Sequence, residues 1–248
     1  MQMEILPLTE IPFVKEGDDL SEMILESADA QNISIGEGDI IVIAQTVVSK
    51  AEGKVVDLRN VEASERAKDL SKRIDEDPRK VEVILQETNE VIRVDHVLIA
   101  ETKHGFICAN AGVDSSNVRS DLVTILPEDP DRSAREIKEK IEKSIGKEVA
   151  VIISDSWGRP FRFGAVGFAV GIAGIDPLQY LKGKKDAYGN KLKTTMIAPP
   201  DSIAAAASLV MGEADEEIPV VVVKDAPYKT GEGSVHELIR PEEGDLFR

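Results

Sequence analysis

Short β-rich runs alternate with helical patterns along the whole chain, and this alternation limits the fold more than any other feature. Helical patterns appear around residues 20–25, 67–74 and 81–85. With 248 residues the chain is long enough to bury a sizeable core. The pattern predicts a fold of mixed α and β structure and does not reveal the order of the strands. Six apolar runs bounded by turn residues predict the strands: Glu4 to Leu8, Asp39 to Ala44, Val97 to Glu101, Phe106 to Ala109, Val149 to Ser154 and Ile218 to Val223.

The clearest helix is expected over Ser133 to Ile145. Ser133 and Glu136 match a capping box, and isoleucine recurs at every fourth position. Gly146 is suited to end this helix. An alanine-rich helix reaching Met211 is also expected, with Asp201 or Ser202 as its cap.

The acidic and proline-rich segment Leu126 to Arg132 is the clearest break in the pattern. It predicts a loop near 126–132 between two subdomains. It does not require units that fold independently, so we treat residues 1–248 as one domain.

The charge balance argues against two classes of partner. Acidic residues number 46 and basic residues 30, which gives a formal net charge of −16. Nucleic acid and anionic membrane surfaces both need clustered Lys and Arg, so neither is expected as a partner. The first eight residues lack a basic stretch followed by a long apolar run, and the single cysteine requires no oxidising compartment. A cytoplasmic location is therefore expected.

The strongest candidate for chemistry follows the apolar run that starts at Val151. Asp155 comes directly after this run and offers a hard oxygen ligand for Mg²⁺ or Mn²⁺. Arg159 and Arg162 follow within seven residues, and a cation beside arginines suits a polyphosphate. The structural alternative is that Asp155 caps a turn and that the arginines pair with surface acids. Trp157 either stacks on an aromatic ligand or packs the loop.

Other polar segments also follow β-rich runs. Asp114 and Asn117 lie in an Asn- and Ser-rich loop, which serves either as a ligand site or as an Asx turn. Lys50 suits phosphate but lies outside any Walker A sequence, and the alternative is a solvent-facing lysine in a surface hairpin. Glu213 either binds a second cation or is solvated. Cys108 is expected in the core rather than as a nucleophile, because no histidine is adjacent to it.

Taken together and in this order, these segments resemble the F420 gamma-glutamyl ligase family. Several blocks spread over nearly the whole chain are more specific than any single motif. At Gln45 and Thr46, at Ser156 and Trp157, and across 214–217, the sequence departs from the pattern expected of the family. The resemblance rests on Ile11 to Leu20, Val48 to Gly53, Ser64 to Ala67, Asn110 to Asn117, Ile152 to Arg159, Val166 to Gly171, Asp186 to Gly189, Met211 to Glu213 and Gly231 to Ser234.

The resemblance implies a GTP-dependent ligase that acts as a homodimer. It also implies an α+β fold like that of the family, with mixed sheets and helices in two closely associated subdomains. In such an enzyme GTP phosphorylates the carboxylate of the deazaflavin precursor F420-0, L-glutamate attacks the acyl phosphate, and a second glutamate is added to F420-1 through a γ-linkage. Two divalent cations, Mn²⁺ or Mg²⁺, are implied together with K⁺. Asp114 and Asp155 would hold one metal, and Ser156 and Glu213 the other. Asp114, Asp155 and Arg159 would be catalytic. The GTP site would include Ile11, Pro12, Phe13, Val14, Gln45, Thr46, Lys50, Asn117, Met211 and Gly212.

Two alternatives come from other functional classes. One is a nucleotide- or deazaflavin-binding protein without ligase turnover, although three separated acids exceed what simple binding needs. The other is a carboxylate-dependent metal phosphohydrolase, although no histidine lies near the acids in the sequence.

Overall fold

A five-stranded sheet forms the centre of the protein in the computed structural model, which describes residues 2–245. Its strand order is β1-β12-β2-β8-β9. β2 and β8 run parallel, and the other neighbours are antiparallel. Branched aliphatic residues fill β2, β12 and the first half of β8, and they are buried on both faces. The strands are β1 (Glu4–Leu8), β2 (Ile40–Ala44), β8 (Ala150–Arg159), β9 (Arg162–Ala173) and β12 (Val220–Lys224).

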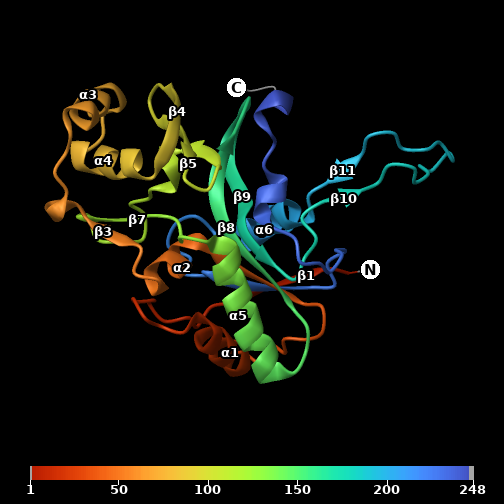
Figure 1. Cartoon of the computed structure of the whole chain (residues 1–248). Coiled ribbons are helices and arrows are strands. Elements are labelled where there is room, and N and C mark those ends of the chain that lie inside the picture. The colour runs from red at the N-terminus through yellow and green to blue at the C-terminus, as the bar shows by residue number, and fades with distance from the viewer. Residues whose placement is uncertain (1, 246–248) are drawn as a thin grey trace.

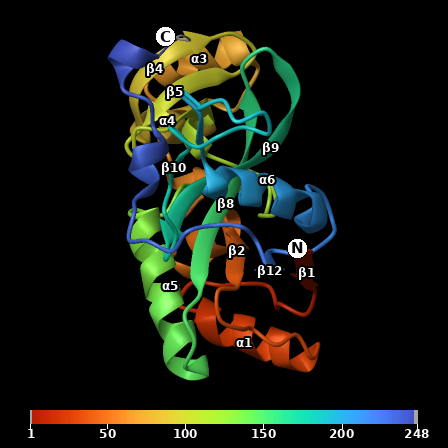
Figure 2. The ribbon, with the colours of Figure 1, turned by 90° about the vertical axis from the view of Figure 1, so that its right-hand side faces the viewer.

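Helices pack on both faces of this sheet (Figures 1 and 2). The pairing of β8 with β9 shifts by one residue between Ile153 and Ser154. Because of this bulge, residues of β9 that are four positions apart across the shift point to opposite faces of the sheet. Gly171 lies against α5, and Gly167 lies against α6. α1 packs beside α5 and also contacts β1. The helices are α1 (Leu20–Ala30), α2 (Gln45–Ala51), α5 (Pro130–Ile145) and α6 (Pro199–Met211).

A smaller body with its own apolar cluster is inserted between α2 and α5. Its buried residues run from Leu58 to Val123, and they are separate from the cluster around the central sheet. The chain leaves through β3 (Val55–Asp57) and returns through β7 (Leu122–Thr124), and these two strands pair. Figure 1 shows this body at the upper left. It contains α3 (Glu65–Ile74), α4 (Pro78–Gln86), β4 (Thr88–Val94), β5 (Leu98–Thr102) and β6 (Ile107–Ala109).

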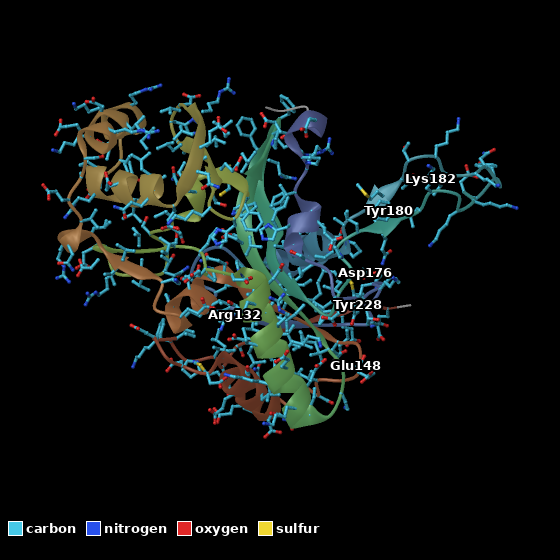
Figure 3. All side chains as sticks on the ribbon, viewed as in Figure 1. Arg132, Glu148, Asp176, Tyr180, Lys182 and Tyr228 are labelled. Carbon is cyan, nitrogen blue, oxygen red and sulfur yellow. The ribbon has the colours of Figure 1, made fainter. Side chains whose placement is uncertain are left out.

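A long arm projects from the central body (Figures 1 and 3). It is held by the short pair β10 (Gln179–Tyr180) and β11 (Met196–Ile197). At its base Asp176 forms an ion pair with Lys229. Short 3₁₀ helices complete the fold at Leu58–Asn60, Asn110–Gly112, Val235–Leu238 and Glu242–Gly244. None of the helices within residues 2–245 combines the length and apolarity needed to cross a membrane.

The predicted α+β class with mixed sheets is confirmed, and all six predicted strands exist. The sequence analysis did not predict β3, β4, β7 and β9, nor the short pair β10 and β11. β8 is the main correction to the predicted bounds, because it continues through Arg159 instead of ending at Ser154.

Both predicted helix caps were wrong. α5 begins at Pro130, and its cap is Asp129, whose carboxylate accepts a hydrogen bond from the Arg132 amide at 2.9 Å. Proline fits this first position because its missing N–H would have no helical partner there. The Ser133 hydroxyl instead bonds Glu52 at 2.5 Å. The predicted end at Gly146 is confirmed.

The second incorrect cap concerns α6, which begins at Pro199 after Ala198. Asp201 lies inside the first turn of this helix. Its carboxylate accepts a hydrogen bond from the Ala169 amide at 3.0 Å, which ties α6 to β9. Ser202 bonds the carbonyl of Ala198 at 3.0 Å.

Candidate active site

A cavity of about 1160 Å³ opens where the carboxyl ends of β2 and β8 meet the end of α6. The small body closes one side of it through the loop that carries Asp114. The cavity brings together fourteen of the fifteen residues predicted for the site; the exception is Arg159. The fourteen are Ile11, Pro12, Phe13, Val14, Gln45, Thr46, Lys50, Asp114, Asn117, Asp155, Ser156, Met211, Gly212 and Glu213.

Asp155 lies on the part of β8 that has passed beyond its partner β2. One carboxylate oxygen accepts a hydrogen bond from the Ser156 amide at 2.9 Å, and the other accepts one from the Trp157 indole at 2.7 Å. Burial, with smaller contributions from the nearby charges of Asp114 and Glu213, raises the pKa of Asp155 to about 6. The carboxylate is therefore held in a fixed orientation, in a position where a cation would stabilise its charge.

Trp157 packs the wall behind Asp155. Its ring centroid lies 5.4 Å from that of Phe106 and 5.6 Å from that of Phe168. Trp157 therefore packs the loop, as one of the two alternatives predicted. Its indole N–H also donates to the Asp155 carboxylate and so helps to orient it.

Ser156 and Glu213 meet across the cavity wall. The Ser156 hydroxyl donates to a carboxylate oxygen of Glu213 at 2.5 Å. Glu213 follows Gly212, which ends α6 with a φ of 74°. Residues 57 positions apart thus form one pair, because α6 packs along β9 beside β8.

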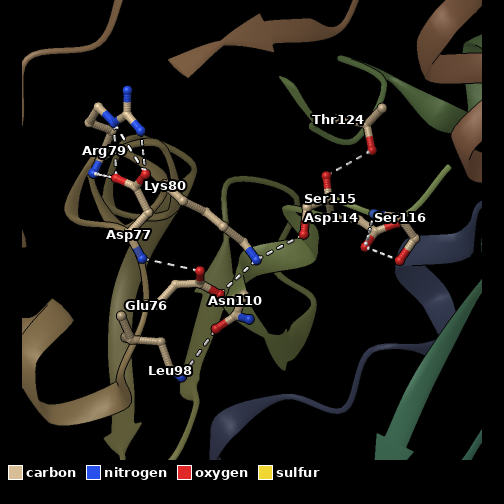
Figure 4. A network of polar contacts seen from close by, with 10 residues as sticks. All are labelled: Glu76, Asp77, Arg79, Lys80, Leu98, Asn110, Asp114, Ser115, Ser116 and Thr124. Atoms are coloured by element: carbon tan, nitrogen blue, oxygen red, sulfur yellow. Dashed lines mark hydrogen bonds and ion pairs between the residues drawn. The ribbon is translucent and has the colours of Figure 1, made fainter. Parts of the chain in front are cut away.

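The Asp114 loop is fixed at both ends by the small body (Figure 4). The backbone of Asp114 pairs with Thr124, and its carboxylate accepts hydrogen bonds from the Ser116 amide and hydroxyl at 3.0 and 2.8 Å. Lys80 of α4 donates to the Ser115 hydroxyl at 3.1 Å. The Asx turn, which was the structural alternative for this loop, is therefore present. Asp114 nevertheless lines the cavity, so the turn and a ligand role for Asp114 are compatible.

Lys50 is the main basic group facing these acids. It lies in α2, so the alternative of a surface hairpin is wrong. Its ammonium donates to the carbonyl of Asn117 at 2.7 Å. Burial lowers the pKa of Lys50, and the charge of Asp114 opposes that shift. The cavity thus pairs one half-buried cation with an anionic wall.

Arg159 lies outside the cavity lining. Its guanidinium donates to the carbonyls of Phe163 and Gly164 at 3.2 and 3.4 Å, across the turn between β8 and β9. Its predicted catalytic role stays a prediction. Cys108 is buried in β6, and burial raises its pKa to about 12, which agrees with the expected core position.

Sequence reasoning missed two basic residues of the cavity lining, Lys15 and Arg119. Arg119 approaches the carboxylate of Asp121 at 3.6 Å. The available signal was its position two residues after Asn117, on the same loop. The side-chain amide nitrogen of Gln45 is already bonded within the protein, because it donates to the Ser49 hydroxyl at 2.5 Å and to the carbonyl of Ile125 at 3.3 Å.

Comparison with known proteins identifies the family of this chain. The model of the F420-0:Gamma-glutamyl ligase family matches residues 9–225. This chain belongs to that family. The chain is 47% identical to the coenzyme F420:L-glutamate ligase of Methanothermobacter thermautotrophicus over the full length of both proteins. It is 49% identical to the protein of the same name from Methanocaldococcus jannaschii, over all of this chain and 97% of the relative. It is 42% identical to that of Archaeoglobus fulgidus, again over all of this chain and 97% of the relative.

Proposed function

We propose that this protein is a ligase that joins L-glutamate to a deazaflavin acceptor in coenzyme F420 biosynthesis, with GTP as the energy source. One observation carries the proposal. Asp114, Asp155 and Glu213 come from three distant segments and face one cavity, with Lys50 beside them. The names of the full-length relatives support the same activity.

The chemistry explains why such a site needs acids and a lysine. A carboxylate is a poor acyl donor, because hydroxide or oxide would have to leave. Transfer of the γ-phosphoryl group of GTP to the acceptor carboxylate creates an acyl phosphate, and the amine of glutamate then displaces phosphate. Charge must be offset while the phosphoryl group passes between two anions. Lys50 lines the cavity and would contact the phosphates as a point charge. The backbone and side chain of Thr46, at the start of α2, would contact them as well.

The donor set fits hard divalent cations. Asp114 and Asp155 would hold one Mg²⁺ or Mn²⁺, and Ser156 and Glu213 would hold the second. Within residues 2–245 no three His, Cys, Asp or Glu side chains gather around a single point. Each cation would thus take only part of its shell from protein, and Mg²⁺ typically completes it with water and phosphate oxygens. When bound, the cations would neutralise developing charge on the phosphoryl oxygens.

The remaining expectations belong to the same proposal. They are K⁺ as an activator, a homodimer, a cytoplasmic location, and the addition of a second glutamate to F420-1 through a γ-linkage. The acidic segment 214–217 lies at the cavity rim and brings extra negative charge near the proposed phosphate position.

The deciding experiment incubates the purified protein with F420-0, L-glutamate, GTP and Mn²⁺ and measures product masses. We expect gains of one or two glutamyl units that disappear when GTP is omitted. GTP hydrolysis that needs neither acceptor nor glutamate would favour a phosphohydrolase. Tight binding of GTP and F420-0 without any mass gain would favour a binding protein.

A further inference from the structure

The β8–β9 hairpin extends well beyond the central sheet as a two-stranded ribbon. Residues from Ala150 to Ser154 pair with β2, whereas Asp155 to Arg159 pair with β9 alone. The base of this ribbon lines the cavity from Ser154 to Gly158. In Figure 2 the ribbon rises past α6 toward the small body. The strand that holds the reacting groups therefore also forms the projecting turn.

Two phenyl rings lie at the tip of this ribbon. Phe161 is 92% exposed, and Phe163 is fully exposed. The two rings lie three and five positions beyond Gly158, the last residue of the ribbon that lines the cavity. Neighbouring exposed aromatic rings are uncommon on a protein surface, because they forgo the free energy of burial. An exposed apolar group of this kind is typical of a surface that is covered when a ligand binds.

The tip has a defined shape. The Arg159 guanidinium bonds the carbonyls of Phe163 and Gly164, which locks the turn from inside. Phe161 and Gly164 adopt positive φ values of 61° and 86°. A positive φ is costly for a bulky residue such as phenylalanine, so the surrounding turn must fix that conformation. A rigid aromatic surface loses little entropy when it binds a ring.

The distance from the tip to the reacting groups is short. Phe163 is four residues from Gly167, which pairs with Ser156 at the cavity base. Four residues of chain span at most about 14 Å. A ligand with an aromatic ring at one end and a reacting carboxylate at the other can therefore contact both places at once.

The charge of the ribbon favours an anionic ligand. Residues 158–167 contain Arg159 and Arg162 and no acidic residue, although the whole chain carries a net charge of −16. Among the described residues, no carboxylate forms an ion pair with either arginine. Arg162 is exposed beside the two rings.

We propose that this tip binds the aromatic end of the acceptor, with the flat ring stacked on Phe163 while the acceptor carboxylate lies beside Ser156. The proposal rests on the proposed function, which supplies an acceptor with a deazaflavin ring, a flexible chain and a terminal carboxylate. Continuity with the cavity and the basic charge favour this ligand over a second copy of the chain.

The test compares Phe163→Ala with Tyr188→Ala, a matched control in which an equally exposed ring is removed from the β10–β11 arm. In Phe163→Ala we expect the KM for the acceptor to rise about tenfold, since an aromatic stack contributes on the order of 1 kcal/mol. The KM values for GTP and glutamate should change less than twofold. The exposed position predicts an unchanged melting temperature for both variants.

A binding experiment separates this inference from the ligase activity. The probe is a deazaflavin ring without its chain, titrated by the quenching of its fluorescence. Wild type and Phe163→Trp should both bind the ring. Phe163→Ala should bind it about tenfold more weakly. Wild-type turnover with an unchanged acceptor KM in Phe163→Ala would overturn the inference alone, as would a change in oligomeric state without a change in acceptor KM. No glutamyl transfer by wild type, with normal binding of the ring, would instead overturn the proposed function.

Discussion

The two halves of the β8–β9 hairpin have similar backbones and opposite surroundings. In the inner half, Val151 to Ile153 are completely buried between helices and pair with strands on both sides. In the outer half, Asp155 to Gly158 pair on one side only and line the cavity. The inner half is apolar, whereas the outer half carries the carboxylate, the hydroxyl and the indole that form one wall of the site.

This difference teaches how the molecule separates stability from chemistry. Inner residues are closely packed, so they contribute mainly to the free energy of folding. Outer residues are held by the continuation of the same strand, which gives them a fixed position without burying them completely. Substitutions in the two halves should therefore affect different measurements.

The largest expected effect lies in the outer half. We expect Asp155→Asn to lower kcat by about 10³-fold or more, because it removes an anionic oxygen from the proposed cation site. Folding should not suffer. Burial, with smaller contributions from the neighbouring carboxylates, raises the pKa of Asp155 to about 6, so the carboxylate that is charged above that pH lowers the free energy of unfolding, and a neutral asparagine removes this cost. Steady-state kinetics and thermal unfolding at pH 8 measure both quantities.

Asp201→Asn is the matched control for this substitution. Asp201 of α6 is also a carboxyl whose pKa is raised by burial, but it accepts a hydrogen bond from the Ala169 amide of β9 and does not line the cavity. An asparagine oxygen can accept the same hydrogen bond, so activity should persist. Retained ligase activity with normal metal dependence in Asp155→Asn would remove Asp155 from the set of ligands.

The next effect tests the inner half. A Cβ atom at Gly171 would lie 2.5 Å from the carbonyl oxygen of Pro130. We expect Gly171→Val to lower the free energy of unfolding by about 3 kcal/mol, since overpacked cores must move backbone. In the outer half, a Cβ at Gly158 would meet no atom within 4 Å, so Gly158→Ala should leave stability nearly unchanged. Urea unfolding measures both variants, and equal stabilities would contradict the division.

Local sequence signals explain most of the elements and few of their ends. The isoleucine spacing of α5 and the apolar runs of the central sheet follow directly from burial periodicity. The start of α5 was misplaced because Pro130 and Asp129 were interpreted as a loop, although proline favours the first turn of a helix. β9 was missed because its glycines resemble a turn, and only the approach of α5 and α6 shows why Gly171 and Gly167 are there.

The site could be predicted further than the fold that builds it. Asp114, Asp155 and Glu213 were identified from their positions after β-rich or helical runs and from the family resemblance, and the structure places all three in one cavity. Their relative placement depends on tertiary packing of α6 on β9 and of the small body on β7, which no local pattern encodes. For the same reason the hydrogen bond from the Trp157 indole to Asp155 could not be predicted from the sequence.

A smaller effect concerns the wall that faces the outer half. We expect Lys50→Ala to weaken GTP binding about tenfold, because a half-buried ammonium near the proposed phosphates is lost. Isothermal titration with GTP and Mn²⁺ measures this directly. Lys143→Ala removes an exposed lysine of α5 far from the lining and should leave the affinity unchanged. An unchanged affinity in Lys50→Ala would remove this residue from the nucleotide site.

The smallest effect concerns the helices that cover the inner half. Lys140 of α5 contacts Asp19, the cap of α1, at 2.7 Å. The hydrogen bond from Lys140 is the main cause that lowers the pKa of Asp19. A lowered folded-state pKa gives stability that is present above the unfolded value near 3.9 and is lost as pH falls through the folded value. Both groups are largely exposed, so we expect Lys140→Ala to cost about 0.5 kcal/mol at pH 7 and almost nothing near pH 2. Urea titrations of wild type and variant at several pH values measure the difference, and a pH-independent cost would show that Lys140 acts through packing of its alkyl chain on α1 rather than through its charge.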